Sequence, residues 1–305
     1  MKNQNKEELK NKILARYELY KLQGSRVKRV LRSPFHTIPY FIRQYLAYIK
    51  PYKVTRKTLW GENMSYYLPE GGMLYYYGFF EANLSNFFIN FLQEGDTFFD
   101  IGAHVGYYSM LASSLVGDTG KVVSFEPTPR TFQSLKENTA HKKNVQIYNN
   151  AVLDKEIDIE FFDYGPKYSA FNSFKKRTDK DISFRDDAER IVVKTIALDD
   201  FCKNKNLLPD LIKIDAEGAE HLILKAMDTI LTEVQPCVTI EVGGGEEWKE
   251  NCTQSINLLL NKDYEVYEIT LEGLLKKHTP KESYLYDNLF FIHTNKTARI
   301  QNLLA

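Results

Sequence analysis

From about residue 81 onward, short apolar runs alternate with segments of helical periodicity, beginning with a helix at 84–91. Between the third and fourth runs, the irregular stretch 154–195 carries two strand-like segments, 157–162 and 191–196, that predict a hairpin. Alternating strands and helices are typical of α/β proteins, so we predict a seven-stranded, doubly wound, mostly parallel sheet. Its strands are predicted at 97–101, 121–126, 144–151, 211–215, 237–241, 264–269 and 288–292.

The first 80 residues have a different pattern, that of two amphipathic helices. We therefore predict that residues 1–80 form a basic helical N-terminal extension and that residues 81–305 form the main domain. Pro39 lies near the start of the second helix and Pro51 ends it. The first helix carries its apolar stripe at Leu9, Ile13, Tyr17 and Tyr20, and the second at Ile38, Phe41, Ile42, Tyr45, Leu46 and Ile49.

Composition excludes several classes of protein. Of the 305 residues, 43% are hydrophobic and 13% aromatic, which is enough to bury a sizeable core and excludes extensive disorder. No apolar run is long enough to span a membrane, and the polar first ten residues predict no secretory signal. The three cysteines form no paired motif, which disfavours a zinc site or a disulfide framework. We expect a cytoplasmic protein.

The formal net charge of zero hides a strong asymmetry along the chain. Residues 1–57 contain 15 basic and 3 acidic residues, and the remainder contains 25 basic and 37 acidic residues. The segment 25–57 has nine basic residues and no acid. We expect the second helix to pack on the main domain or on a second copy of the chain; the alternative is peripheral contact of residues 25–57 with an anionic membrane, at its inner face. The sequence contains no recognisable nucleic-acid-binding module, so we predict no nucleic-acid partner.

Candidate chemistry lies at the carboxyl ends of the predicted strands, where doubly wound sheets bind ligands. The first strand runs into the turn Asp100-x-Gly102-x-x-x-Gly106. Glycines there would let a ligand approach the backbone, and the following helix would offer N–H groups to an anion. A tight turn from strand to helix also favours glycine for purely structural reasons, so the turn alone identifies no ligand.

Glu126 ends the second strand, where an acid can accept hydrogen bonds from both hydroxyls of a ribose. A dinucleotide would need a further glycine in the first turn, where this chain has Ala103, His104 and Val105. Their side chains disfavour a pyrophosphate. A cofactor with one nucleoside and an amino-acid tail fits better, which describes S-adenosylmethionine.

Carboxylates gather after the fourth and fifth strands. Asp215, Glu217 and Glu220 lie within six residues, and Glu241 closes the next strand. They could act as a general base, hold a cation or bind a divalent metal. For Glu220 we favour a structural role at a helix N-terminus, and we rank Asp215 first and His104 second as bases. The remaining histidines have no metal-binding spacing, so we predict no metal site.

Five motifs occur in an order that resembles the FkbM family of S-adenosylmethionine-dependent methyltransferases. They are FFDIGAHVGYYS, VVSFEPTP, TIALDDF, LIKIDAEGAE and VTIEV, and the resemblance covers roughly residues 81–293. It implies a class I methyltransferase fold, Rossmann-like, with the last strand antiparallel. It also implies O-methylation of a hydroxyl group on a sugar, a glycan or a related natural product.

The resemblance also implies roles for individual residues. Asp215 and Glu217 would face the methyl-transfer site, and Asn150 and Ala151 would lie near the adenine. Glu126 would bind the ribose. The cofactor-binding set that follows is Asp100, Gly102, Ala103, His104, Gly106, Glu126, Pro127, Asn150, Ala151 and Asp215.

The polar and aromatic loop 167–174 is a candidate for the acceptor pocket, with Asn172 and Ser173 from the loop and Glu241 from the sheet as substrate-binding residues. The segment Asp215-Ala-Glu217-Gly replaces the Asn/Asp-Pro-Pro-aromatic segment of methyltransferases that act on amines or amides. A nicotinamide-dependent oxidoreductase and a catalytically silent binding protein are the competing hypotheses. If the extension reaches a membrane, the acceptor would be a lipid-linked glycan.

Overall fold

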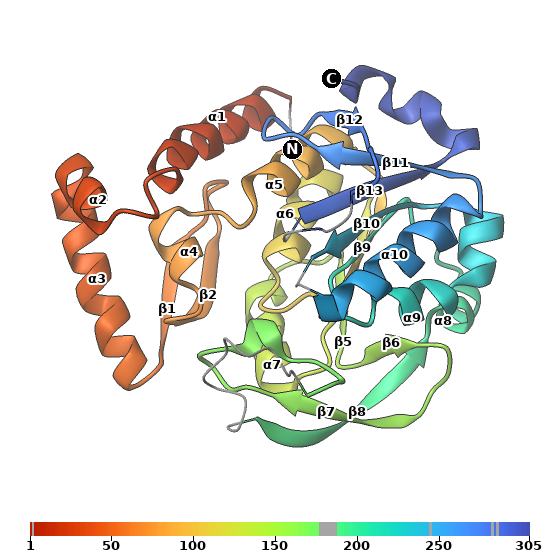
Figure 1. Cartoon of the computed structure of the whole chain (residues 1–305), viewed down its shortest axis with the longest axis horizontal. Helices are drawn as coiled ribbons and strands as arrows, with labels where there is room; N and C mark the ends of the chain where they lie inside the picture. Colours follow the sequence, from red (N-terminus) through yellow and green to blue (C-terminus); the bar gives the residue numbers. More distant parts are fainter. Residues whose placement is uncertain (2, 177–187, 244–245, 282–283, 285–286) are drawn as a thin grey trace.

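The computed structural model describes residues 1–305 except 2, 177–187, 244–245, 282–283 and 285–286. Its centre is an eight-stranded sheet in the order β12-β11-β13-β10-β9-β3-β4-β5 (Figure 1). All seven predicted strands are present, and the short β12 adds an eighth at one edge. The strands are β3 (Thr97–Ile101), β4 (Lys121–Phe125), β5 (Val145–Tyr148), β9 (Leu211–Ile214), β10 (Cys237–Val242), β11 (Tyr264–Ile269), β12 (Leu275–Lys277) and β13 (Asp287–His293).

The first strand of the main domain, β3, lies inside the sheet and pairs in parallel with β4 and β9. The last strand, β13, runs antiparallel between β10 and β11, so the predicted direction of that strand is confirmed. Ile101 at the end of β3 is in register with Ile214 at the end of β9. The residues that follow these two strands therefore emerge together at one edge of the sheet.

The central strands are buried on both faces, as in other doubly wound sheets. In β3, Phe98 packs in one core against Phe88, and its neighbour Phe99 packs in the other core near Phe201. Helices α5 (Ala82–Phe91) and α6 (Tyr107–Val116) cover the first face. The second face is covered by α8 (Leu198–Lys205), α9 (Glu220–Lys225) and α10 (Glu246–Leu260).

A small three-stranded sheet lies beside the main one (Figure 1). It contains the predicted hairpin, although residues 177–187 within the predicted irregular stretch lie outside the described residues. The third predicted strand divides at Asn149 and Asn150 into β5 and a strand of the small sheet. The members of the small sheet are β6 (Ala151–Leu153), β7 (Asp158–Asp163) and β8 (Glu189–Ala197), and the remaining elements of the main domain are α7 (Pro129–Thr139), a π-helical turn (Ile230–Val234) and two 3₁₀ segments (Ser169–Phe171 and Thr294–Leu303).

The N-terminal extension contains more than the two predicted helices. Leu9 and Ile13 of its first helix are buried against the main domain, as the apolar stripe requires. A hairpin and two short helices, which the sequence pattern did not predict, complete the segment. Its elements are α1 (Asn3–Tyr20), α2 (Arg26–Arg32), α3 (Pro34–Ile49), β1 (Tyr52–Lys57), β2 (Asn63–Leu68) and α4 (Gly72–Tyr76).

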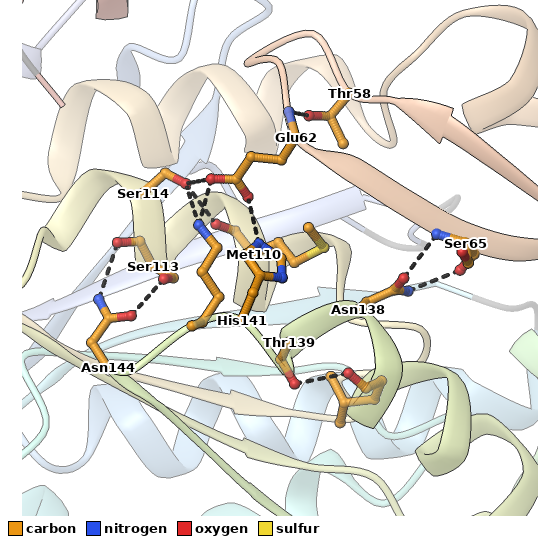
Figure 2. Close-up of polar contacts among 12 residues, drawn as sticks. Thr58, Glu62, Ser65, Met110, Ser113, Ser114, Asn138, Thr139, His141 and Asn144 are labelled. Atoms are coloured by element: carbon orange, nitrogen blue, oxygen red, sulfur yellow. Dashed lines mark hydrogen bonds and ion pairs between the residues drawn. The ribbon is translucent and has the colours of Figure 1, made fainter.

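Partly buried polar contacts fix the hairpin to α6 and to α7 and the residues that follow it (Figure 2). The Asn138 side chain accepts a hydrogen bond from the Ser65 N–H and donates one to the Ser65 carbonyl, both at 2.8 Å. Glu62 accepts a hydrogen bond from Ser114 at 2.9 Å and pairs with Lys142. The extension is thus attached to the main domain by specific bonds as well as by apolar packing.

Helix α3 does not bury the stripe that its periodicity suggested. Thr37 and Ala47 are buried, whereas the predicted apolar residues are exposed except Phe41, which is half-buried. The expectation that this stripe packs on the main domain is therefore wrong. In the described part of the chain, no helix combines the length and apolarity that crossing a membrane requires.

Replacing Asn138 with alanine should lower the free energy of unfolding by about 2–4 kcal/mol, because it leaves the backbone groups of Ser65 without partners. Urea unfolding would measure the change. Gln133→Ala, on an exposed position of the same helix, is the control. Equal stabilities of the two variants would show that the bonds between Asn138 and Ser65 do not stabilise the hairpin.

Candidate functional site

A cavity of about 280 Å³ opens where the carboxyl ends of β3, β4, β9 and β10 meet. Most of the residues predicted for the site line it, but Asp100, Gly106 and Ser173 do not. Those that do are Gly102, Ala103, His104, Glu126, Pro127, Asn150, Ala151, Asn172, Asp215, Glu217 and Glu241.

The glycines of the first turn allow close packing between chain segments. Gly102 has φ +78°, and a Cβ there would lie 1.8 Å from the carbonyl oxygen of Asp215. At Gly106, φ is +90° and a Cβ would meet Leu135 at 2.6 Å. Glycine at these positions brings the end of β9 and helix α7 against the turn, which sets the shape of the cavity.

Asp100 lies beneath the cavity and is fully buried. Its carboxylate accepts a 2.5 Å hydrogen bond from the Ser109 hydroxyl, in the first turn of α6, and lies 3.9 Å from the Lys213 ammonium. Burial raises the pKa of Asp100, although Lys213 and Ser109 oppose this effect. Asp100 therefore positions the start of α6 and Lys213 and does not face the cavity.

Glu126 faces the cavity from the end of β4. Its two oxygens accept hydrogen bonds from the N–H groups of His104, at 3.0 Å, and Thr128, at 2.9 Å. Burial raises the pKa of its carboxyl group. Each carboxylate oxygen has a second lone pair, so Glu126 retains the capacity to accept bonds from a diol. Beyond it the wall is apolar, with Val152 and Phe161 beside Asn150 and Ala151.

Three carboxylates meet on the opposite wall. The oxygens of Asp215, Glu217 and Glu241 lie within 4.8 Å of one another. Oxygen ligands of this kind suit a divalent cation. However, Lys213 already occupies one side of Asp215, with its ammonium 2.9 Å from that carboxylate. The group thus has an internal counterion.

Two of these three groups, Asp215 and Glu241, have opposite pKa shifts. Burial alone would raise the pKa of Asp215, but the Lys213 ammonium, the hydrogen bond with Glu241 and the charge of His104 together outweigh burial and lower the pKa. Burial, together with the negative charges of Asp215, Glu217 and Glu81, raises the pKa of Glu241 well above its usual range. The shifts favour an ionised Asp215 and a protonated Glu241 that donates a hydrogen bond to Asp215.

Two acids that the sequence reasoning missed also line the cavity, Glu70 and Glu81. Glu81 accepts a 2.7 Å hydrogen bond from the Tyr108 hydroxyl and another from Asn288. Its bonding partners are 27 and 207 residues away along the chain, so no local pattern marks it. Apart from the protonated Glu241, five carboxyl groups line the cavity against Lys213 and His104, so the cavity favours a cationic ligand.

His104 and Glu70 meet at the loop 167–174. His104 Nε2 lies 2.8 Å from the Ser169 hydroxyl and 3.6 Å from Glu70. Burial lowers the pKa of His104, but Glu70, Glu126 and Asp215 outweigh it, so the net shift is upward. The loop therefore borders the cavity, as predicted, and is tied to the extension through Glu70.

The two loop residues proposed to bind the acceptor have other contacts. The amide of Asn172 donates to the Thr128 hydroxyl at 3.0 Å and accepts from the Tyr164 N–H at 2.8 Å. Ser173 donates its hydroxyl hydrogen to the Lys175 carbonyl, away from the cavity. Asn172 holds the loop in place, and the structure does not bring Ser173 to the site.

A sheet with this strand order, a glycine turn after its first strand and an acid after its second has the architecture of a class I S-adenosylmethionine-dependent methyltransferase. Residues 100–266, more than half of the chain, match the family described as the Methyltransferase FkbM domain. The chain belongs to the FkbM methyltransferase family, and its cofactor is S-adenosylmethionine.

Individual relatives are distant. The hexuronic acid methyltransferase AglP of Haloferax volcanii is 26% identical over 159 residues, which cover 52% of this chain and 60% of AglP. A solved methyltransferase FkbM from Methylobacillus flagellatus is 14% identical with a TM-score of 0.42, covering 74% of this chain and 55% of that one. An O-methyltransferase from Bacillus cereus, solved with SAH, is 11% identical with a TM-score of 0.40, covering 69% and 79%.

Replacing Glu241 with glutamine should stabilise the protein more at about pH 8 than at about pH 5. A carboxyl group whose pKa is raised by folding binds more protons in the folded state than in the unfolded chain. Its contribution to stability is therefore present below the ordinary value of 4.5 and is lost as pH rises through the raised pKa. Glutamine removes this loss and can still donate a hydrogen bond to Asp215.

Thermal unfolding at the two pH values would measure the difference. The control is Glu233→Gln at an exposed position, which should change the stability equally at both pH values. A change in stability for Glu241→Gln that does not depend on pH would contradict the shared proton.

Proposed function

We propose that this methyltransferase transfers a methyl group to a hydroxyl group of a sugar, within a glycan or a related natural product. The observation that carries the proposal is the convergence of an ionised Asp215, with His104 and the loop 167–174, on one acidic cavity. The similarity to a hexuronic acid methyltransferase supports a sugar acceptor. The residues after β9 also lack the segment typical of enzymes that act on amines.

The charged and apolar walls of the cavity support S-adenosylmethionine as its ligand. We assign Glu126 to the ribose hydroxyls, because it lies at the end of β4 and retains acceptor capacity. The apolar wall beside Asn150 and Ala151 would receive the adenine. The carboxylates of Glu81 and Asp215 would face the positive charges of the ammonium and sulfonium groups. When bound, the cofactor supplies an electrophilic methyl group.

On the acceptor side, the protein has to align a hydroxyl group and remove its proton. Asp215 is our first candidate for the base, because Lys213 holds it ionised at neutral pH. The raised pKa of His104 favours its protonated form, which donates hydrogen bonds and does not accept a proton. We therefore assign His104 to orienting the acceptor, with Glu70 fixing the imidazole. Glu217 and Glu241 would line the acceptor site on the wall that carries Asp215.

The competing hypotheses fit less well. The acidic cavity and the side chains at Ala103 and His104 both oppose the pyrophosphate of a nicotinamide dinucleotide. A silent binding protein would have no need to keep Asp215 ionised against the cost of burial. Neither alternative has an observation in its favour.

Replacing Glu126 with glutamine should weaken binding of S-adenosylhomocysteine about 10- to 100-fold, because a charged acceptor of the ribose hydroxyls is lost. Isothermal titration calorimetry would measure the affinity. Asp118→Asn, at an exposed position in the turn after α6, should bind as the wild type does. Unchanged affinity in Glu126→Gln would show that the ribose lies elsewhere.

A strain lacking the gene should lose one methyl group from a surface glycan. The wild-type gene should restore it, and a gene carrying Asp215→Asn should not, because the base is missing. Mass spectrometry of released glycans would detect a difference equal to one methylene group. The Asp118→Asn gene serves as the control. If Asp215→Asn restored the glycan fully, Asp215 would not be the base.

A further inference from the structure

Exposed apolar side chains are concentrated on one face of α2 and α3, the outer face. Nine of the fifteen exposed large hydrophobic residues fall between positions 27 and 49, and the others are scattered along the chain. Phe35 is 96% exposed and Leu31 is 78% exposed. This outer face consists of Val27, Leu31, Phe35, Ile38, Ile42, Tyr45, Leu46 and Ile49.

The inner side of α3 is held by specific contacts, which fixes the direction of the outer face. The Thr37 hydroxyl bonds to the Tyr76 hydroxyl at 2.6 Å, and the Gln44 amide donates to the Pro69 carbonyl at 3.2 Å. Ala47 is fully buried beneath the helix. In Figure 1, α2 and α3 lie at the left margin of the molecule, with α4 and the β1–β2 hairpin on their inner side. Turning the outer face inward would break these contacts.

All the charged residues of the segment that carries the outer face, 25–57, are basic. The segment 25–57 contains nine basic residues and no acid. Four of these have partners: Lys53 pairs with Glu137, Arg29 packs on Phe41 and Tyr76, and Arg43 and Arg56 pack on Tyr75. The other five have no acidic partner among the described residues. They are Arg26, Lys28, Arg32, Lys50 and Lys57.

We propose that the outer face of α2 and α3 binds the surface of an anionic lipid bilayer. Its apolar side chains would enter the boundary between headgroups and acyl chains, and the flanking Lys and Arg side chains would contact lipid phosphates. The charges favour this occupant over a second copy of the chain. A symmetric dimer through this face would bring two basic segments together with no acid from either to compensate.

This binding surface is connected to the loop 167–174, which is the candidate acceptor pocket. Gln44 of α3 holds the loop at Pro69, and the next residue, Glu70, bonds to Ser169 and Ala170 at the cavity. Binding of α3 to a bilayer would therefore hold the cavity close to the membrane surface. Resting on the proposed function, this placement favours a lipid-linked sugar as the acceptor. The membrane binding itself does not depend on that function.

Sedimentation of the full-length protein with lipid vesicles tests the proposal. We expect the protein to sediment at low salt with vesicles of phosphatidylcholine and phosphatidylglycerol, and only weakly with phosphatidylcholine alone or at high salt. The triple variant Arg32→Gln, Arg43→Gln, Lys50→Gln should reduce the partition coefficient about a hundredfold, because each basic residue adds to the attraction. Phe35→Ser combined with Ile42→Ser should reduce it at least about tenfold.

Matched variants elsewhere on the surface are the controls. Lys203→Gln, Lys205→Gln, Lys249→Gln removes three exposed charges, and Leu208→Ser removes an exposed apolar side chain. Both should bind vesicles as the wild type does. Equal losses in the control and test variants would overturn the proposal.

Sedimentation velocity in the absence of lipid tests whether the outer face instead binds a second copy of the chain. A dimer that Phe35→Ser, Ile42→Ser abolishes, together with no binding to anionic vesicles, would assign the face to a second copy and overturn the proposal. Retained vesicle binding in a protein that methylates no glycan would instead reject only the proposed function.

Discussion

The site depends on one ion pair, between the buried Lys213 and the half-buried Asp215. Lys213 is 2% exposed, and its ammonium lies between Asp215, at the end of β9, and the fully buried Asp100 on β3. Removing charges from water costs several kcal/mol per ion unless partners compensate, so each of the three requires the others. The pair holds Asp215 ionised, and this in turn leaves Glu241 protonated. Lys213, in a central strand, therefore decides which carboxyl groups on this wall of the cavity are charged.

The rest of the cavity extends this arrangement. Glu70, Glu81 and Glu126 come from three separate segments and face a space that contains few positive charges. Such a cavity is unfavourable when it holds only water and neutral solutes, and it becomes favourable when a cationic ligand enters. A cofactor with sulfonium and ammonium groups meets that requirement. The fold therefore contributes both the shape of the site, through the approach of Gly102 to Asp215, and its selectivity for charge.

The N-terminal extension forms part of the same unit. Its hairpin is bonded to α7 through Asn138, and the loop that follows the hairpin carries Glu70 to the cavity. Periodicity correctly predicted α1, the position of α3 and every strand of the main sheet except β12. It did not predict the β1–β2 hairpin or the exposure of the α3 stripe. A helical stripe shows which side is apolar, but it carries no information about what covers that side.

The sequence by itself determined the α/β sheet, the glycine turn after β3 and the acids at the ends of β4, β9 and β10. These features depend on local order, because the residue that follows a buried strand must emerge at the edge of the sheet. Only the tertiary structure decided that Asp100 lies beneath the cavity, that Asn172 holds its own loop and that Glu70 and Glu81 join the site. Their partners are distant in the chain, and the protonation of each carboxyl group depends on burial and on neighbouring charges, which exist only once the chain has folded.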